Sequence, residues 1–501
     1  MMLRTCVLLT GVTFYSLCAS AEEIAPIHLP PAALTLDGAR HALDRLSFGP
    51  TPNEIQAVRD IGVDRWIALQ LTPAAIPEPP ALTEALAALP NAQRSDADLF
   101  RQEVRLRRDK TDDGKDERKE FTRAVTRDVM SAHLDRALLS DRQLQEVLTN
   151  FWFNHFNVFL NKGFDHVWVG NYENEAIRPY VLSNFRLLLE ATARHPAMLF
   201  YLDNWQNTAP GSPGAKGKQD GLNENYAREL MELHTLGVDG GYTQKDVTEL
   251  ARILTGWGLR TRPERGMVRG DMRKPDFTFA FDPSRHDYGD KQFMGFVIKG
   301  QRQGWQEVEQ ALSILATHPA TAKHLSFQLA QYFVADQPPQ ALVDRMAATW
   351  VKSRGDLAAV MRTLLESPEF WAPEARGAKY KTPFEYIVSG LRAANVTPGD
   401  PQPVFGQLRL LGQPIYGIET PDGYKQVESA WLNPDALARR LSFATALGTG
   451  RLGKETVPVD EAAVRSTLGR TLTPQTDKAL AAADPRLRTT LLLGSPDFMY
   501  R

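Results

Sequence analysis

The stretch LQEVLTNFWFNHFNVFL at residues 144–160 shows the apolar spacing that dominates this chain and decides its fold class. A helix turns by about 100° per residue, so residues three and four apart share a face. One broad face of this helix is mostly aromatic and consists of Leu148, Phe151, Trp152, His155, Phe156 and Phe159. We therefore expect His155 to be a structural histidine packed among aromatic rings.

The opposite face of the same stretch is a row of carboxamides. Asn150, Asn154, Asn157 and, if the helix continues that far, Asn161 fall within about 40° of one another. Carboxamides offer donors and acceptors without charge, which suits sugar hydroxyls, peptide backbone or polar side chains of another helix. Two alternatives explain this row: it forms a binding surface, or it makes hydrogen bonds to a neighbouring helix.

Helical spacing of this kind recurs along most of the chain and is interrupted by one convincing strand signal. The strand-like runs Phe277 to Phe281 and Phe293 to Ile298 are joined by a polar turn. The sequence therefore predicts an all-α or nearly all-α protein, a large multi-helix domain over residues 37–501 with a small β-hairpin insertion at about 276–298. A C-terminal subdomain could begin at about residue 305, and residues 22–36, rich in Pro and Ala, are expected to be an extended lead-in before a helix that Asp37 could cap.

The N-terminus has the pattern of a secretory signal peptide over residues 1–21. Arg4 precedes an apolar run at 7–17, and Ala19-Ser20-Ala21 forms a small-residue cleavage site before Glu22. Both cysteines, Cys6 and Cys18, lie in this segment, so the mature chain would have no disulfide, thiolate metal site or cysteine nucleophile. A periplasmic or extracellular location follows, and no later run is long enough to predict a transmembrane segment in the mature chain.

Charge excludes one class of function. The 501 residues include 58 Lys plus Arg and 60 Asp plus Glu, which gives a net charge of -2. A nucleic-acid-binding protein needs a positive field to hold phosphates. The composition therefore predicts no nucleic-acid partner.

The segment NENYARELMELHTLGVDGGYT at 223–243 predicts a helix with a polar edge. Asn225, Glu229 and Glu232 converge on that edge, whereas His234 faces away and is expected to be structural. A cation held by the two glutamates would need ligands from elsewhere in the chain. The alternative is a solvent-exposed helix face on which Arg228 forms i,i+4 ion pairs with Glu224 and with Glu232.

The polar turn of the expected hairpin supplies the best such ligands. His286, Asp287, Asp290 and Lys291 lie within six residues and could bind a divalent cation or position an acid and a base, although Asp and Gly also favour an ordinary turn. The candidate polar site therefore consists of Asn154, Asn225, Glu229, Glu232, His286, Asp287 and Lys291. Its candidate metal ligands are Glu229, Glu232, His286 and Asp287.

Several stretches together resemble the bacterial family catalogued as domain of unknown function 1800. They are ALDRLSFGPTPNEI at 42–55, NFWFNHFNV at 150–158, RPYVLSNFRLLLEATARHPAMLFYLDN at 178–204, NENYARELMELHTLGVDGGYTQKDV at 223–247, FDPSRHDYGDK at 281–291 and LLESPEF at 364–370. The resemblance extends from about residue 37 to the terminal SPDFMYR, and LGQPIYGIETPDGY at 411–424 departs from the family's usual version.

This resemblance implies a large, exported, mainly helical bacterial protein without an assigned activity, often encoded near an exported protein of alkaline-phosphatase-like type. It marks the polar residues Asn154, His155, Asn223, Glu224, Asn225, Glu229, Glu232, His234, His286, Asp287 and Lys291 without giving them a mechanism.

Two functional classes remain open, and the sequence does not decide whether the protein is an enzyme. The first is a binding or assembly module that recognises a carbohydrate or a companion exported protein, through the asparagine row and the Gly- and Pro-rich loop at 207–221. The second is a metal-assisted hydrolase with Glu229, Glu232 and either His286 or Asp287. Standard hydrolase, zincin and nucleotide-binding motifs are absent from the sequence, which favours the first class.

Overall fold

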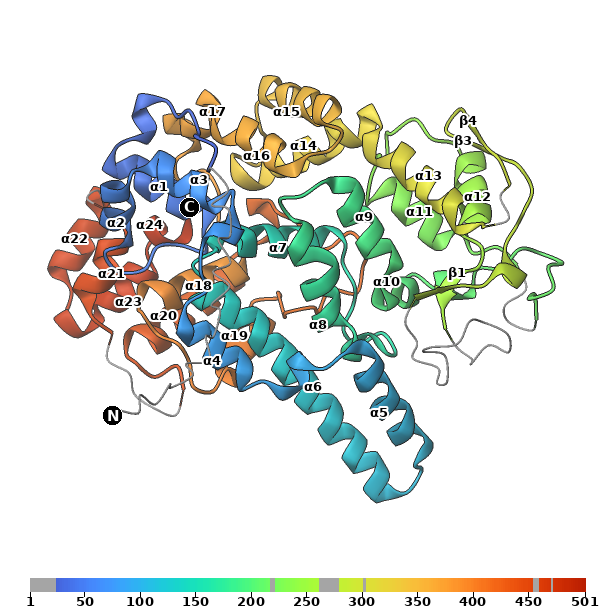
Figure 1. Ribbon diagram of the computed structural model, residues 1–501. Coiled ribbons are helices and arrows are strands. Elements are labelled where there is room, and N and C mark those ends of the chain that lie inside the picture. The colour runs from blue at the N-terminus through green and yellow to red at the C-terminus, as the bar shows by residue number, and fades with distance from the viewer. Residues whose placement is uncertain (1–23, 217–220, 261–278, 301–302, 454–458, 470–471) are drawn as a thin grey trace, which may run out of the picture.

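A computed structural model describes residues 24–216, 221–260, 279–300, 303–453, 459–469 and 472–501. The expected signal peptide at 1–21 lies outside these residues. The protein is mostly helical (63%), and its described part contains 24 α-helices and two small two-stranded antiparallel sheets. The prediction of a nearly all-α fold is confirmed (Figure 1).

The chain enters the fold through a short 3-10 turn and four helices. These helices are α1 Leu36–Leu46, α2 Glu54–Ile61, α3 Val63–Gln70 and α4 Pro80–Ala87. Thr35, rather than Asp37, caps α1, because its side chain accepts a hydrogen bond from the Gly38 backbone N–H at 3.0 Å. The expected lead-in is held against the body, since the Arg362 guanidinium donates to the Pro26 carbonyl at 2.6 Å.

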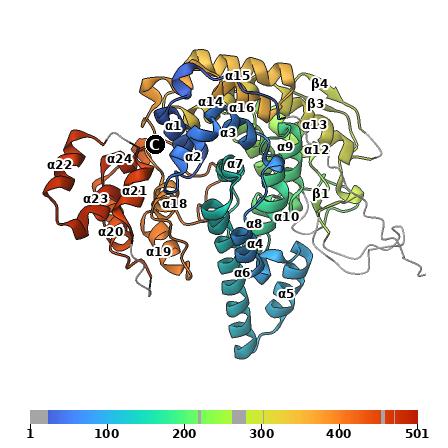
Figure 2. The same ribbon diagram turned by 60° about the vertical axis from the view of Figure 1, so that its left-hand side comes forward.

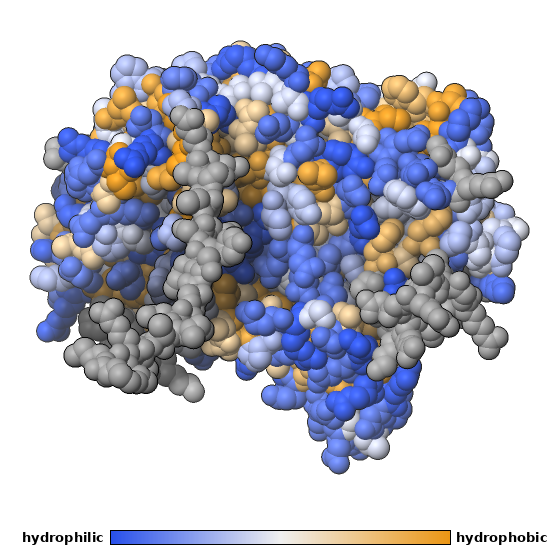
Figure 3. Space-filling view, in the orientation of Figure 1, coloured by the Kyte–Doolittle hydropathy of each residue, from blue (hydrophilic) through white to orange (hydrophobic). Residues whose placement is uncertain are grey.

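A helical hairpin projects from the body of the molecule (Figure 1). It consists of α5 Asp96–Arg108 and α6 Asp112–Leu139, which Ser95 and Thr111 cap. Glu103 is fully buried between the two helices and accepts hydrogen bonds from Arg107 at 2.6 Å and from Arg118 at 2.9 Å. The tip of the hairpin is predominantly hydrophilic (Figure 3).

The centre of the molecule is built from six helices that carry most of the residues singled out in the sequence. They are α7 Gln143–His155, α8 Val169–Asn171, α9 Phe185–Arg194, α10 Pro196–Tyr201, α11 Glu224–Glu232 and α12 Gln244–Ile253. Helix α7 ends at His155, so Asn157 and Asn161 lie beyond it and the expected four-residue helical row is wrong. The reason is local, because His155 is followed by Phe156 in a non-helical conformation.

The prediction that the runs at 277–281 and 293–298 form one hairpin is wrong, because these two runs do not pair with each other. Strand β2 (Phe279–Phe281) pairs with β1 (Trp257–Leu259), and β3 (Lys291–Phe293) pairs with β4 (Phe296–Ile298). The tight turn of the β3–β4 hairpin needs two residues with positive φ, which are Met294 at 50° and Gly295 at 80°. The part of the expected hairpin at 276–278 lies outside the described residues.

The remaining twelve helices complete the fold. They are α13 Trp305–Thr317, α14 Pro319–Phe333, α15 Gln340–Ser353, α16 Leu357–Leu365, α17 Pro368–Trp371, α18 Pro383–Ala393, α19 Gln402–Leu410, α20 Pro434–Gly448, α21 Glu461–Thr467, α22 Pro474–Ala482, α23 Arg488–Leu493 and α24 Pro496–Met499. Helices α20 to α24 gather at one side of the molecule, beside α1 and α2 (Figure 2).

Helix α18 ties the two ends of the chain to the centre. Its Arg392 is buried and donates to the Gly49 carbonyl at 2.7 Å and to the Leu138 carbonyl at 2.9 Å. Most of the buried apolar side chains form one connected core that runs from Ile27 to Met499. A subdomain that begins at residue 305 stays a prediction. No helix in the described part is both long enough and apolar enough to cross a bilayer.

Candidate functional site

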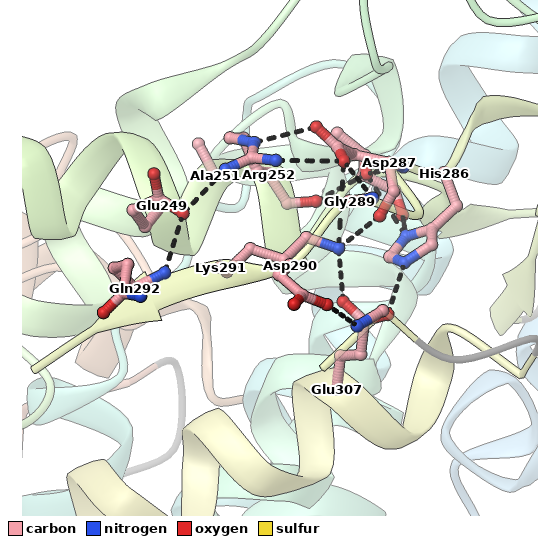
Figure 4. A network of polar contacts seen from close by, with 12 residues as sticks. Glu249, Ala251, Arg252, His286, Asp287, Gly289, Asp290, Lys291, Gln292 and Glu307 are labelled. Atoms are coloured by element: carbon pink, nitrogen blue, oxygen red, sulfur yellow. Dashed lines mark hydrogen bonds and ion pairs between the residues drawn. The ribbon is translucent and has the colours of Figure 1, made fainter. Parts of the chain in front are cut away.

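The residues of the expected site fall into two separate polar groups. The first group surrounds β3 and is drawn in Figure 4. Lys291 and Glu307 are fully buried, and the Lys291 ammonium donates to a Glu307 carboxylate oxygen and to the Asp287 carbonyl. His286 is also buried, with Nε2 at 3.4 Å from the other Glu307 oxygen and Nδ1 at 2.7 Å from the Thr255 carbonyl.

Arg252 of α12 extends this buried network toward the surface. Its guanidinium donates to both Asp287 carboxylate oxygens, at 2.8 Å and 3.2 Å, and to Glu249 at 2.7 Å. Burial raises the pKa of Asp287, but hydrogen bonds from Arg252 and the Gly289 backbone outweigh it and hold that pKa below its usual value. Each charged side chain of this network is paired with one of opposite charge. The geometry is therefore that of a structural network that holds β3 against α12 and α13.

The second group lines an open cavity of about 240 Å³, which we call the α7–α11 cavity. Helix α7 contributes Asn154 and His155, helix α11 contributes Glu232, and helix α14 contributes His324 and Gln328. The segment that closes the cavity contains Asp422 and Tyr424. Three residues that the sequence singled out, Asn154, His155 and Glu232, therefore meet here.

His155 and His234 lie against each other on the inner side of this cavity. His155 is 8% exposed and His234 is 1% exposed, and the Nε2 atom of His155 lies 3.2 Å from the His234 carbonyl. Burial lowers the pKa of His155 to about 3 and the pKa of His234 well below its usual value. Both imidazoles are therefore neutral at neutral pH. Their packing beside Trp152 and Phe156 agrees with a structural role, which stays a prediction.

Asn154 and Asn157 hold the segment that closes the cavity. The Asn154 amide donates to the Tyr424 carbonyl at 2.9 Å and accepts from the Tyr424 N–H at 2.7 Å. Asn157 donates to the carbonyls of Ile418 and Thr420 at 3.1 Å and 2.9 Å. These two carboxamides thus bind backbone of the same chain, which is one of the three kinds of partner that the sequence suggested.

Glycine is required where this segment passes over α7. Gly423 has φ of 65°, and a Cβ atom added there would lie 2.2 Å from the Asn154 carbonyl oxygen. We call residues 418–426 the strap. Its residues 418–424 fall in the stretch 411–424, where the sequence departs from the usual family version.

Glu229 and Glu232 lie near enough to the strap to interact with its charges. Burial raises the pKa of Glu229, and the neighbouring carboxylates of Glu232 and Asp422 raise it further. Glu232 accepts a hydrogen bond from the Tyr242 hydroxyl at 3.3 Å, and Asp422 pairs with Lys425 at 2.6 Å. Of the two surface ion pairs that the alternative expects, Arg228 lies 3.5 Å from Glu224, whereas Glu232 lines the cavity. The choice between a solvated face and a shared polar site stays a prediction.

The residues around β3 and the residues of the α7–α11 cavity do not form the single polar site that the sequence predicts. Within the described ranges, no hydrogen bond or ion pair joins Glu229 or Glu232 to His286, Asp287 or Lys291. The physical reason is that Arg252 and Glu307, which lie outside the sequence-predicted site, already pair with the charged hairpin residues Asp287 and Lys291. Asn225 is exposed and donates to the Leu202 carbonyl at 3.3 Å, so it is not among the cavity residues. No group of three or more His, Cys, Asp or Glu suited to a metal ion occurs among the residues that the structure describes.

The loop at 207–221 is fastened to the β-strand region, as far as it is described. The Arg285 guanidinium donates to the Thr208 hydroxyl at 2.8 Å and to the Asn207 carbonyl at 3.0 Å. The Gly214 N–H donates to the Ser284 carbonyl at 2.8 Å. These contacts hold the described part of the loop beside β2 and away from the residues of the α7–α11 cavity.

Together, the fold and this site define a large helical protein with a polar cavity that a strap closes on one side. The chain belongs to the DUF1800 family, described as a protein of unknown function, and the family model matches residues 41–500. No curated protein and no solved structure matches the chain.

Proposed function

We propose that this protein binds a carbohydrate outside the cytoplasm, with one sugar residue in the α7–α11 cavity. The observation that carries the proposal is the lining, which combines uncharged hydrogen-bonding groups and aromatic rings with the carboxylates of Glu232 and Asp422. Gln328 offers donors and an acceptor to hydroxyl groups, Glu232 offers acceptors, and Phe151 and Tyr424 offer apolar surface. Ligand sites commonly place a few polar groups among aromatic ones in this way.

The protonation states of the cavity support an uncharged ligand. Burial lowers the pKa of both His155 and His324, so neither imidazole adds a positive charge at neutral pH. Lys425 is paired with Asp422 at 2.6 Å. A ligand with many hydroxyl groups and no net charge therefore suits this cavity better than a polyanion. The cavity volume of about 240 Å³ favours one sugar unit over a longer segment.

The secretory pattern at residues 1–21 supports a role in the periplasm or outside the cell.

The test is a glycan array followed by calorimetric titration of the best glycan. Glu232→Gln keeps the shape of the side chain and removes its charge, so we expect a loss of affinity of about tenfold or more, because hydrogen bonds to charged groups are the stronger ones. Glu84→Gln on α4 is the matched control, since Glu84 is exposed and outside the cavity. Equal affinity of the parent and Glu232→Gln, or no glycan bound at all, would contradict the proposal.

A second candidate function, binding of a companion exported protein of alkaline-phosphatase-like type, is favoured by the α5–α6 hairpin. The hairpin projects from the body and carries both charge signs in surface pairs such as Arg105 with Glu117. Co-elution of the two purified proteins tests it, with reversal of both charges, Arg105→Glu and Glu117→Arg, as the variant. Binding that survives this variant would place the partner elsewhere.

The alternative function, metal-assisted hydrolysis, requires a cation beside Glu229 and Glu232. A cation held by Glu229 and Glu232 would relieve the repulsion that raises the pKa of Glu229, and its remaining ligands would be water or substrate atoms, because the described residues offer no third ligand of a suitable group. Calcium or magnesium should then raise the melting temperature of the parent and not that of Glu229→Gln. An equal response of both proteins would remove this alternative.

A further inference from the structure

The strongest unassigned feature lies around the buried amine of Lys381, between α1 and α24. The Lys381 residue is 5% exposed, and its ammonium lies 4.0 Å from the centre of the Phe498 ring. Across the described ranges, this ammonium has no hydrogen bond and no ion pair. Buried charges are normally paired, so a lysine in this state indicates a missing partner.

Lys381 lines a small recess that adjoins a larger open pocket. The recess has a volume of about 10 Å³, which is room for one oxygen-sized group. The larger pocket has a volume of about 440 Å³. The two share Arg40, Asp44, Asp497 and Tyr500 as lining residues, so a molecule in the pocket lies directly against the recess.

The carboxylates around this site are already engaged. Asp44 pairs with Arg40 at 3.3 Å, and Glu385 pairs with Arg501 at 2.8 Å. Asp497 accepts hydrogen bonds from the Thr473 and Thr476 hydroxyls. None of these carboxylates forms an ion pair with Lys381, so within the described ranges its ammonium has no carboxylate partner, although Asp44 and Asp497 line the recess together with Arg40.

A second cation faces the same pocket from its rim. Arg376 is half-buried, and its Nε atom has no hydrogen-bond partner in the described part of the chain. Its guanidinium makes one long contact, 3.5 Å, to the Ala32 carbonyl. An arginine fork at the rim and an ammonium in the recess form a common arrangement for holding an anionic oxygen group.

The floor of the site is rigid. The backbone of residues 379–381 pairs with the end of the chain, since the Lys381 N–H donates to the Met499 carbonyl at 2.9 Å. The Arg440 guanidinium donates to the Lys381 carbonyl at 2.6 Å. The position of Lys381 is thus fixed by the fold.

We propose that the pocket between α1, residues 376–381 and α24 binds a small oxyanion, a carboxylate or a phosphate group, with one oxygen in the recess against Lys381 and the rest of the molecule beside Arg376. Burial lowers the pKa of Lys381 to about 7, and a bound anion would raise it again, which agrees with this assignment. The site is separate from the α7–α11 cavity and shares no lining residue with it.

The experiment measures the melting temperature of the full protein with sodium sulfate, phosphate or acetate at constant ionic strength and slightly acidic pH. Sulfate is the primary probe because its charge does not change near neutral pH. We expect millimolar sulfate to raise the melting temperature of the parent by a few degrees, since a ligand that binds only the folded state stabilises it. Lys381→Met should lose this shift while its melting temperature without sulfate stays equal or rises.

Phosphate that acts more strongly than acetate would identify a phosphate ligand, and the reverse would identify a carboxylate. Lys352→Met is the matched control, because Lys352 is exposed on α15 and should leave the sulfate shift unchanged. If Lys381→Met does not fold, Arg376→Gln serves instead and should weaken sulfate binding about tenfold in a calorimetric titration. The proposal is overturned if the parent responds to none of the three anions, if Lys381→Met keeps the full shift, or if Arg376→Gln binds sulfate as the parent does.

Discussion

Asn154 and Tyr424 are joined by a reciprocal pair of hydrogen bonds, 2.9 Å from the Asn154 amide to the Tyr424 carbonyl and 2.7 Å from the Tyr424 N–H to the Asn154 amide oxygen. This pair connects two residues 270 positions apart and sets the strap over the end of α7. It gives one wall of the α7–α11 cavity its position. The state of this wall decides whether the carboxylate of Asp422 and the ring of Tyr424 face a ligand.

Replacement of Asn154 by Ala should therefore loosen the strap. The Tyr424 backbone loses both partners, and we expect the free energy of unfolding to fall by about 1–3 kcal/mol. Hydrogen exchange of residues 418–426 should become faster than in the parent. Asn161→Ala is the matched control, because Asn161 is exposed and its side chain makes no hydrogen bond within the described structure. Unchanged exchange in the strap after Asn154→Ala would contradict this role.

Loss of His155 should act on stability. Truncation to Ala removes a buried ring between Trp152 and Phe156 and leaves the His234 carbonyl without its contact, which should cost about 1–3 kcal/mol. Denaturant unfolding measures the cost. A variant that unfolds like the parent yet binds no glycan would instead show that His155 belongs to the binding site.

The buried histidines should also make the protein acid-labile. Burial lowers the pKa of His155 to about 3, below its value of about 6.5 in the unfolded chain. Between these values the unfolded state binds the proton more readily, so the free energy of unfolding falls as pH drops from about 6.5 toward about 3. Each such histidine contributes up to about 1.4 kcal/mol per pH unit in that range. His155→Phe should flatten the stability profile, and a parent and variant with parallel profiles would contradict the assignment.

The network around β3 should be sensitive to the removal of one partner. Glu307→Gln leaves the fully buried Lys291 without its carboxylate, and breaking a buried ion pair on one side costs about 3–5 kcal/mol. Joint replacement, Lys291→Met with Glu307→Leu, should recover part of that loss, because no charge is left buried. Thermal unfolding of the two variants provides the comparison. Equal destabilisation by both would show that the pair acts through something other than charge.

Asp165 should behave in the opposite sense to the buried histidines. It is fully buried, both carboxyl oxygens lack hydrogen-bond partners within the described structure, and burial raises its pKa well above the usual value. The folded state therefore prefers the protonated acid, so Asp165 destabilises the fold progressively as pH rises above about 4, its value in the unfolded chain.

Asp165→Asn removes this ionisation while keeping the shape of the side chain. We expect its melting temperature to exceed that of the parent at neutral pH, with a gap that narrows as pH falls toward 4. Asp239→Asn, at an exposed position, is the control. A gap that does not change with pH would rule out titration of Asp165 as the cause.

The fold class could be predicted from the sequence because helical spacing is local. The spacing within residues 144–160 and 223–243 located α7 and α11, and the placement of Glu232 on a polar edge followed from the same geometry. The end of α7 at His155 was missed, since no Gly or Pro marks it. The pairing of β2 with β1 was also missed, because it joins segments about 20 residues apart.

The composition of the cavity could not be predicted because its lining comes from distant parts of the chain. His324 and Gln328 lie on α14, almost 100 residues beyond Glu232, and the strap follows another 90 residues later. Single-sequence periodicity shows which residues share a helix face and gives no information on which helices meet. For this reason, the sequence wrongly suggests that the hairpin residues Asp287 and Lys291 lie beside Glu229 and Glu232. In the structure, Asp287 pairs with Arg252 and Lys291 pairs with Glu307.

The central claim, that the α7–α11 cavity holds one unit of a carbohydrate, is tested most directly by a crystal structure of the parent protein with the glycan that binds best on an array. The proposal expects density for one sugar ring in contact with Glu232, Gln328 and Tyr424, with hydroxyl groups within hydrogen-bond distance of Glu232 and Gln328. A sugar bound at any other surface, with the cavity unchanged, would contradict it.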